Sequence, residues 1–499
     1  MQRACTHITR SFWSLLELSR LLQRRVASSP GQVLVFSIAP SPNIEATVLS
    51  AVASSLSKIS QNHVGCISHP LPYQSTDPDD DPGVDRCSLS LALVDGVSFR
   101  SAIPGRPEPQ VGRWHAGRQR NAGPNHLGHG SAGSGQGVKD AQTQLFNGTE
   151  AVDWEKLWDR TVRSFDSLGG TQTGQNALPH DLRSLDPSTV HDIVYFSDKS
   201  PQGIASVLEG AFPSANKLSL IASSTPFLTG RPVTLFHNGQ VHSDGAVGVA
   251  LTSHTASPPP AVDLAFPPLV ALTPDVVVTS SEGNLILSLD FGNPTRLLLA
   301  AIQKHGLSLS AGPVWIGKED EFYVGVLESD VIVQLHRINS GDPSRGTIAL
   351  DTSAAPREGR VVRLYHLPRG EPHYPFDAKR DLPPLTFFVA PETSPESLQP
   401  SATFSSSVPP SEVKPQDECD AKHAVQVKHP NERQKKSSGI LMSCTGTFYA
   451  ASENGFTLSR GNKGSTTASE GPWTCVVPGG RVGLMFDVPQ RMGGSEDGA

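Results

Sequence analysis

The clearest pattern in the sequence is a set of apolar runs separated by turn-forming residues between Leu218 and Leu251. The first apolar run, Leu218–Ala222, ends at a corner of small polar residues, Ser223-Ser224-Thr225. Two β-like runs then flank Asn238-Gly239, the strongest short signal for a hairpin, because both turn positions need a positive φ. The stretch therefore predicts a buried strand, a polar corner and a hairpin.

A similar order of elements occurs nearer the N-terminus. Gln32–Ile38 is a continuous apolar run, typical of a strand buried on both faces. A helix is predicted over 44–59, where Asn43 caps the first turn. His63–Ser68 forms a second short strand. The apolar runs on either side of Asp95-Gly96 predict a hairpin with an Asp-Gly turn.

The two stretches resemble each other. Residues 193–196 are a short strand, residues 202–212 a helix, and the corner and hairpin described first follow. The order strand, corner, helix, strand and hairpin thus occurs twice, which predicts a weak internal duplication within one α/β domain. The alternative is a chance recurrence of common βαβ patterning.

A second unit begins after the proline-rich break at 257–260. Its apolar runs predict strands at 275–280, 284–289, 321–328, 331–338, 347–350, 360–367, 439–444, 473–477 and 481–488, with a helix at 295–304. We therefore predict an α/β fold with two α/β domains, 30–255 and 270–490, built from mixed, stacked sheets flanked by helices.

Composition changes this picture by adding long inserts. Of the 499 residues, 37% are hydrophobic and 18% charged, while Gly 45 and Pro 42 are high. Residues 104–145 and 383–437 are rich in Gly, Pro, Ser and His and bury too little apolar surface to offset their ordering entropy. We expect both to be disordered inserts, and 491–499 a disordered tail.

The first 29 residues carry five arginines and one acid, Glu17. Their apolar positions fit one face of a helix, so an amphipathic first helix and a cleavable transit peptide are equally good interpretations. The segment lacks the arrangement of a secretory signal. An intracellular location, cytoplasmic or mitochondrial, follows as the expectation.

The net charge bears on the classes of binding partner, and the cysteine spacing bears on disulfide formation. The net charge of −7 argues against nucleic acid, and no apolar run is long enough for a transmembrane segment. The six cysteines are scattered without CxxC pairing, so reduced thiols are expected rather than a disulfide framework.

Several chemical motifs occur in weak form. Gly128–Gly133 matches GxGxxG without a preceding strand, and Gly312–Lys318 resembles a phosphate-binding loop but continues with Glu319. The Cys419, His423 and His429 spacing lacks a fourth zinc ligand. We therefore expect no cofactor and no metal, and name no catalytic residue. A Cys-dependent enzyme using Cys66 or Cys444 is kept as an alternative.

What remains is a set of strand-end corners rich in small hydroxyl, Cys and Gly residues. In α/β units, ligands sit beyond the carboxyl ends of strands, where loops offer hydroxyls and backbone N–H groups. If the corners converge, they line one polar pocket for a small molecule; otherwise they are unrelated turns. The candidate ligand-binding residues are Cys66, Ser68, Ser223, Ser224, Thr225, Glu282, Asn284, Cys444 and Thr445.

These segments resemble the FIST family in their order along the chain. LIASSTPFLTGRPVTLFHNGQVHSDGAVGVAL is similar to the end of a FIST N-terminal domain, and VLVFS…VGCIS to its beginning. SSEGNLILSLDFGNPTRLLLAAI resembles the junction into the FIST C-terminal domain, and SGILMSCTGTFY a later strand of it, in which Thr447 replaces the usual Arg.

The resemblance implies a sensory module of intracellular signalling that binds a small polar molecule such as an amino acid. Some relatives carry an F-box, but residues 1–30 are too short for one. The first alternative is therefore an adaptor or scaffold, related to ubiquitin-ligase substrate receptors, that binds protein partners through the FIST surface or the inserts.

Overall fold

The computed structural model of the protein describes part of the chain. The described residues are 4–11, 32–40, 44, 46–70, 86–103, 177–252, 261–307, 321–342, 344–352, 354–368, 382–391, 442–445, 447–461 and 471–485. The predicted insert 104–145 and tail 491–499 lie outside them.

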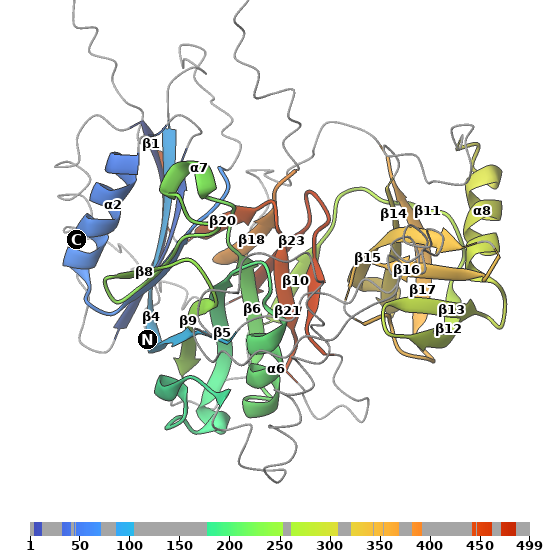
Figure 1. Cartoon of the computed structure of the whole chain (residues 1–499), viewed down its shortest axis with the longest axis horizontal. Helices are drawn as coiled ribbons and strands as arrows, with labels where there is room; N and C mark the ends of the chain where they lie inside the picture. Colours follow the sequence, from blue (N-terminus) through green and yellow to red (C-terminus); the bar gives the residue numbers. More distant parts are fainter. Residues whose placement is uncertain are drawn as a thin grey trace, which may run out of the picture.

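Three sheets organise the described chain (Figure 1). A 12-stranded sheet and a 4-stranded sheet form what we call the main lobe, and a 7-stranded sheet within residues 270–367 forms the second lobe. The main-lobe strands are β1 (Ala4–Ser11), β2 (Gln32–Pro40), β3 (His63–Ile67), β4 (Arg86–Ser101), β5 (Val190–Ser197), β6 (Asn216–Ile221), β7 (Leu235–His237), β8 (Gln240–His242), β9 (Ala246–Thr252), β10 (Ala261–Ala265), β18 (Leu385–Val389), β19 (Met442–Thr445), β20 (Phe448–Ser452), β21 (Phe456–Ser459), β22 (Trp473–Cys475) and β23 (Arg481–Met485).

Helices are few and lie mainly on one side of the large sheet. They are α2 (Ala46–Ile59), α6 (Gln202–Ala211), the short α7 (Pro226–Thr229) and two 3-10 turns, η2 (His180–Leu182) and η3 (Pro187–Thr189). The α2 and α6 helices pack on one face of the large sheet, and the 4-stranded sheet packs on the other. Mixed, stacked sheets in an α/β fold are therefore confirmed, with less helical cover than predicted.

The large sheet contains the predicted recurrence of strand, helix and strand. β2 and β3 form a parallel pair joined by α2, and β5 and β6 form a parallel pair joined by α6. Each pair is extended by an antiparallel strand, β4 beside β2 and β9 beside β5. Because β4 and β9 pair with each other, the two copies meet along one line in the sheet.

The hairpin predicted at Asp95-Gly96 is wrong. β4 runs straight through this dipeptide, with Asp95 opposite Gln32 and Gly96 opposite Leu251. The glycine is needed for close approach rather than for a turn, because a Cβ at Gly96 would lie 2.3 Å from the carbonyl oxygen of Ala250. By contrast, the hairpin at Asn238-Gly239 is confirmed, with φ of 46° and 81° at its two turn residues.

The C-terminal strands return to the main lobe, which divides the predicted domain 270–490. β21 pairs antiparallel with the buried strand β6, Phe456 lying opposite Leu220. Residues 270–367 alone form the second lobe. The pattern of apolar runs did not show which strands join the main lobe and which join the second lobe, because a strand has the same period whichever sheet it joins.

One strand lies within the predicted insert 383–437. All five residues of β18 are buried, between β20 and β23. Its sequence LTFFV is a short apolar run that the surrounding Pro- and Ser-rich composition obscured. The insert prediction is therefore wrong for 385–389, and residues 392–437 lie outside the described part.

The start of the chain also differs from the prediction. Residues 4–11, expected in an amphipathic helix, form β1, which pairs antiparallel with β4 and β19. The β-branched residues of this segment, Thr6, Ile8 and Thr9, favour an extended backbone once two strand edges are present. Residues 12–31 lie outside the described part, so the transit-peptide alternative stays a prediction.

The second lobe is a small barrel with one helix. Its elements are β11 (Val270–Ala271), β12 (Val276–Glu282), β13 (Leu285–Leu289), α8 (Pro294–Lys304), β14 (Glu321–Glu328), β15 (Val331–Asp342), β16 (Thr347–Leu350) and β17 (Val361–Leu367). Pairing of β14 with both β15 and β17 closes the ring of strands. The Leu298 and Ile302 side chains of α8 pack into the core of the lobe.

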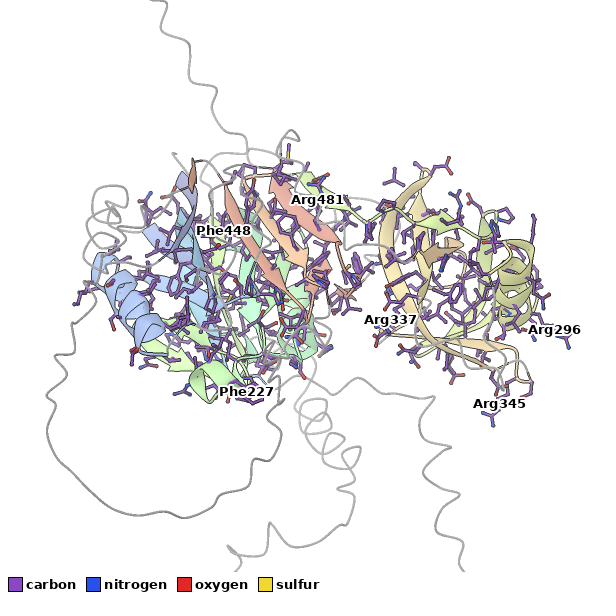
Figure 2. The ribbon with its side chains drawn as sticks, turned by 90° about the horizontal axis from the view of Figure 1, so that it is seen from above. Phe227, Arg296, Arg337, Arg345, Phe448 and Arg481 are labelled. Atoms are coloured by element: carbon purple, nitrogen blue, oxygen red, sulfur yellow. The ribbon has the colours of Figure 1, made fainter. Side chains whose placement is uncertain are left out.

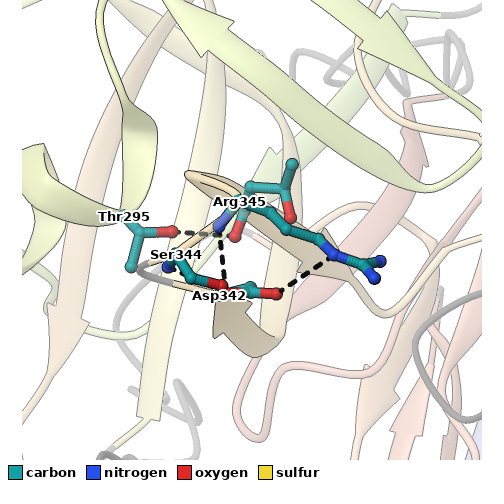
Figure 3. Close-up of polar contacts among 5 residues, drawn as sticks. Thr295, Asp342, Ser344 and Arg345 are labelled. Carbon is teal, nitrogen blue, oxygen red and sulfur yellow. Dashed lines mark hydrogen bonds and ion pairs between the residues drawn. The ribbon is translucent and has the colours of Figure 1, made fainter. Parts of the chain in front are cut away.

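A clasp of polar contacts joins the β15–β16 loop to the start of α8 (Figure 3). Asp342 Oδ1 accepts hydrogen bonds from the backbone N–H of Ser344 at 2.9 Å and of Arg345 at 3.1 Å. Thr295 Oγ1 donates to the carbonyl oxygen of Thr347 at 2.8 Å. The Asp342 contacts fix the shape of the loop, and the Thr295 contact holds the loop against the start of α8.

The lobes meet through buried side chains of the barrel. Tyr323, Leu335 and Tyr365 belong to the same hydrophobic core as the main-lobe strands, and the His336 ring lies 5.9 Å from the Trp473 ring on β22. Figure 2 shows Arg337 on the side of the second lobe that faces the main lobe, whereas Arg345 lies at its far end.

Candidate functional site

The two strand ends on which the sequence prediction rests come into direct contact. The backbone N–H of Ser223, just after β6, donates a hydrogen bond to the carbonyl oxygen of Ile67 at 3.3 Å. Ser68 lies beside this contact and accepts a hydrogen bond from the hydroxyl of Ser37 at 2.6 Å. We call residues 66–68 and 223–225, together with Glu453, the strand-end junction.

The loop between β20 and β21 closes the strand-end junction. Glu453 Oε1 accepts a hydrogen bond from the backbone N–H of Ser224 at 2.7 Å, and Asn454 Nδ2 donates to the carbonyl oxygen of Ala222 at 2.8 Å. Two buried atoms, Ser223 Oγ and Glu453 Oε2, have no hydrogen-bond partner within the described chain. The junction is thus polar, with Ser68, Ser223 and Thr225 buried and Ser224 exposed.

Thr225 has a local structural role. Its hydroxyl contacts that of Thr234 at 2.8 Å, and the Thr229 hydroxyl contacts the Thr234 hydroxyl at 2.7 Å. This chain of hydroxyls holds α7 against the strand that follows, which accounts for the burial of Thr225 without a ligand.

Cys66 lies on β3 with its side chain fully buried. Burial raises the pKa of its thiol far above the ordinary value, which works against thiolate formation at neutral pH. The pKa of Cys87 and of Cys475 is likewise raised by burial, to about 12 in each case. This environment is typical of an inert core thiol.

The other predicted site residues lie elsewhere. Cys444 and Thr445 are on β19, which precedes β20, whereas the strand-end junction meets the loop after β20. Glu282 is exposed and Asn284 buried in the second lobe, where Asn284 Nδ2 donates to the carbonyl oxygen of Leu350 at 3.1 Å. The four corners therefore do not converge on one pocket.

The structure instead shows a polar groove at the opposite end of β3. Two adjoining hollows, of about 490 and 410 Å³, share Val97 and Asp181 in their walls. We call their joint lining the polar groove: Asn62, Gly96, Val97, Ser98, His180, Asp181, Arg183, Ser184, His237 and Asn238. Its size falls within the range of small-molecule sites.

The Asn238-Gly239 hairpin forms one wall of the polar groove and is firmly anchored. Asn238 Oδ1 accepts from the backbone N–H of His63 at 2.9 Å, and the N–H of Gly239 donates to His63 Nε2 at 2.9 Å. His63 Nδ1 lies 2.7 Å from the carbonyl oxygen of Ser60 and must therefore carry the proton. Burial lowers the pKa of His63, consistent with this neutral tautomer.

The opposite wall carries charge. Asp181, on η2, has a half-exposed carboxylate, and Arg183 follows it with Nε donating to the carbonyl oxygen of Leu178 at 2.9 Å. Ser98 donates to Asn62 Oδ1 at 2.6 Å, and both residues line the groove. The groove thus presents a carboxylate, amide and hydroxyl groups and an imidazole.

Sequence reasoning identified the hairpin but not its function as a groove wall. Asn238 and Gly239 were interpreted as a turn only, and no pattern marked Asp181 or Asn62. The available signal was a concentration of polar residues around one confident turn, HNGQVHSD.

No group of three or more His, Cys, Asp and Glu side chains in the described ranges is arranged to hold a metal ion. Within the same ranges, no helix has the length and apolarity to cross a membrane. Comparison with family models, curated proteins and solved structures finds no match. The resemblance to the FIST family therefore remains a prediction.

Proposed function

We propose that the protein is a sensory module that binds a small polar molecule, such as an amino acid, in the polar groove. The observation that carries the proposal is the position of Asp181, which lines both hollows and has a half-exposed side chain. A carboxylate there accepts hydrogen bonds from an ammonium or other N–H group. The amides of Asn62 and Asn238 add the convergent polar groups that such sites use for orientation.

A metabolite screen by thermal unfolding tests this proposal. A molecule that binds only the folded protein raises its unfolding temperature by mass action. We expect hits among amino acids and related amines, and at least tenfold weaker binding in Asp181→Asn. Glu282→Gln, an exposed carboxylate in the second lobe, is the matched control and should bind normally. Equal affinity in Asp181→Asn and the wild type would contradict the proposal.

A second candidate, a protein-interaction adaptor, is favoured by two exposed aromatic side chains. Phe227 on α7 is 101% exposed, and Phe291 is 93% exposed with a φ of 61°. Aromatic residues are enriched at protein interfaces, and strained backbone positions such as that of Phe291 cluster at functional sites. The adaptor function predicts that Phe227→Ala with Phe291→Ala abolishes a partner cross-link without changing metabolite binding.

A further inference from the structure

Beside the hairpin wall of the polar groove lies a cluster of nitrogen atoms without partners. Arg100 Nε and Nη1, His237 Nε2 and His242 Nε2 are buried and make no hydrogen bond within the described chain. Buried donors in native proteins almost always have partners. The four atoms, on three neighbouring residues, can therefore all donate to one acceptor group when both imidazoles carry their proton on Nε2.

The fold brings the three residues together from distant parts of the chain. Arg100 is near the end of β4, beyond the point where β2 stops pairing with it. His237 and His242 are on the paired strands β7 and β8, where His237 lies opposite Gln240 and Leu235 opposite His242, so both imidazoles share a face. β7 packs against both β4 and β9, and Arg100 acts electrostatically on both imidazoles.

The cluster carries the positive charge of Arg100, which the carboxylate of Asp244 partly neutralises. Arg100 Nη2 pairs with Asp244 Oδ1 at 2.7 Å, while its Nε and Nη1 atoms are buried. Gly245 makes room for the guanidinium, because a Cβ there would lie 2.4 Å from Arg100 Nη1. The remaining charged or titratable groups that act on the two imidazoles are Asp181, His63 and Arg231.

We propose that Arg100, His237 and His242 form an oxyanion-binding subsite, which holds the carboxylate or phosphate group of the molecule bound in the polar groove. The guanidinium supplies two N–H donors and each imidazole supplies one through its Nε2–H tautomer. A metal ion is disfavoured at this place by the adjacent guanidinium charge. The subsite rests on the proposed function, because His237 is also a wall of the groove.

The subsite has a distinct dependence on pH. Burial is the largest cause of the lowered pKa of His237 and of His242, so both imidazoles are mainly neutral at pH 7. A bound anion favours their protonated forms. Linkage then requires affinity for the anion to rise as the pH falls from 8 to 6.

Histidine NMR on the full chain tests the subsite directly. With histidine labelled at Cε1 and the signals assigned from His237→Gln and His242→Gln, inorganic phosphate and sodium acetate are titrated separately. We expect saturable shifts of both signals, tighter at pH 6 than at pH 8, and at least tenfold weaker in Arg100→Gln. Asp244→Asn breaks the same ion pair but keeps every donor, so it should bind at least as well as the wild type.

The outcomes separate the two proposals. Preference for phosphate or for acetate identifies which oxyanion the subsite favours. Shifts that do not saturate, or that persist unchanged in Arg100→Gln, overturn the subsite. If metabolites still bind in a manner sensitive to Asp181→Asn, only the subsite fails. If the anions bind through Arg100 while no metabolite depends on Asp181, the proposed function fails and the oxyanion site stands.

Discussion

The backbone N–H of Ser223 hydrogen-bonds to the carbonyl oxygen of Ile67, and this contact joins the ends of corresponding strands in the two copies. Glu453 then ties the next residue, Ser224, to a loop from the C-terminal part of the chain. Three segments distant in sequence are thus fixed at one place in the main lobe.

We expect Glu453→Ala to lower the free energy of unfolding by about 1–2 kcal/mol, because the backbone N–H of Ser224 loses a charged acceptor. Ser223→Ala should change it by less than about 0.5 kcal/mol, since the Ser223 hydroxyl has no partner among the described residues. Urea denaturation measures both. A loss of metabolite binding in Ser223→Ala would place the ligand at the strand-end junction instead of the polar groove.

Gly96 is required for the close approach of β4 and β9. Gly96→Ala should cost about 1–3 kcal/mol, because its Cβ would meet the carbonyl oxygen of Ala250 at 2.3 Å. Gly210→Ala, on α6 with nothing within 4 Å of the new Cβ, should instead stabilise by about 0.5 kcal/mol. Both are measured by chemical denaturation, and a neutral Gly96→Ala would contradict the packing described here.

His336 at the contact between the lobes should make stability depend on pH. Burial lowers its pKa from 6.5 to about 4, so the folded state holds it neutral while the unfolded state takes up a proton below pH 6.5. Its contribution is complete above pH 6.5 and is lost as the pH falls towards 4. Between pH 7 and 5 the expected loss is about 2 kcal/mol, from about 1.4 kcal/mol per pH unit.

The matched variant for this prediction is His336→Gln, which keeps a polar side chain of similar length but cannot titrate. His63, His237 and His242 also have a lowered pKa and act in the same direction, so some pH dependence should remain. The difference in slope between wild type and variant isolates His336. Identical slopes would show that His336 does not stay neutral in the folded protein.

The strand β18 should be essential to the fold. Phe387 is fully buried and its ring lies 6.0 Å from the Phe196 ring of the large sheet. Phe387→Ala should cost about 3–5 kcal/mol. The control is Phe227→Ala, which alters a fully exposed ring (Figure 2) and should change stability by less than about 0.5 kcal/mol.

Local sequence patterns predicted most helices and strands of the fold, but they could not predict which strands pair with one another. The buried strand at 32–38, the helix at 295–304 and the Asn238-Gly239 turn all follow from the residues of each segment and their immediate neighbours. The hairpin prediction at Asp95-Gly96 was wrong because close strand packing and tight turns both select glycine. Only the position of the partner strand shows whether a glycine serves packing or a turn.

The candidate site was predicted only in part. The corners at 66–68 and 223–225 were expected to line one pocket, and Ile67 and Ser223 do touch, but Ser68, Ser223 and Thr225 are buried there. The proximity of Arg100 and His242 could not be predicted from the sequence, because it depends on the packing of β7 against β4.

The pairing of β21 with β6 has a consequence for synthesis of the chain. β6 ends at Ile221, but the strand that covers its outer edge begins at Phe456, more than two hundred residues later. On the ribosome this apolar edge stays open until nearly the whole chain has emerged, and open edges invite pairing with other chains. Completion of the sheet is therefore a late step, and nascent chains should depend on chaperones to protect that edge.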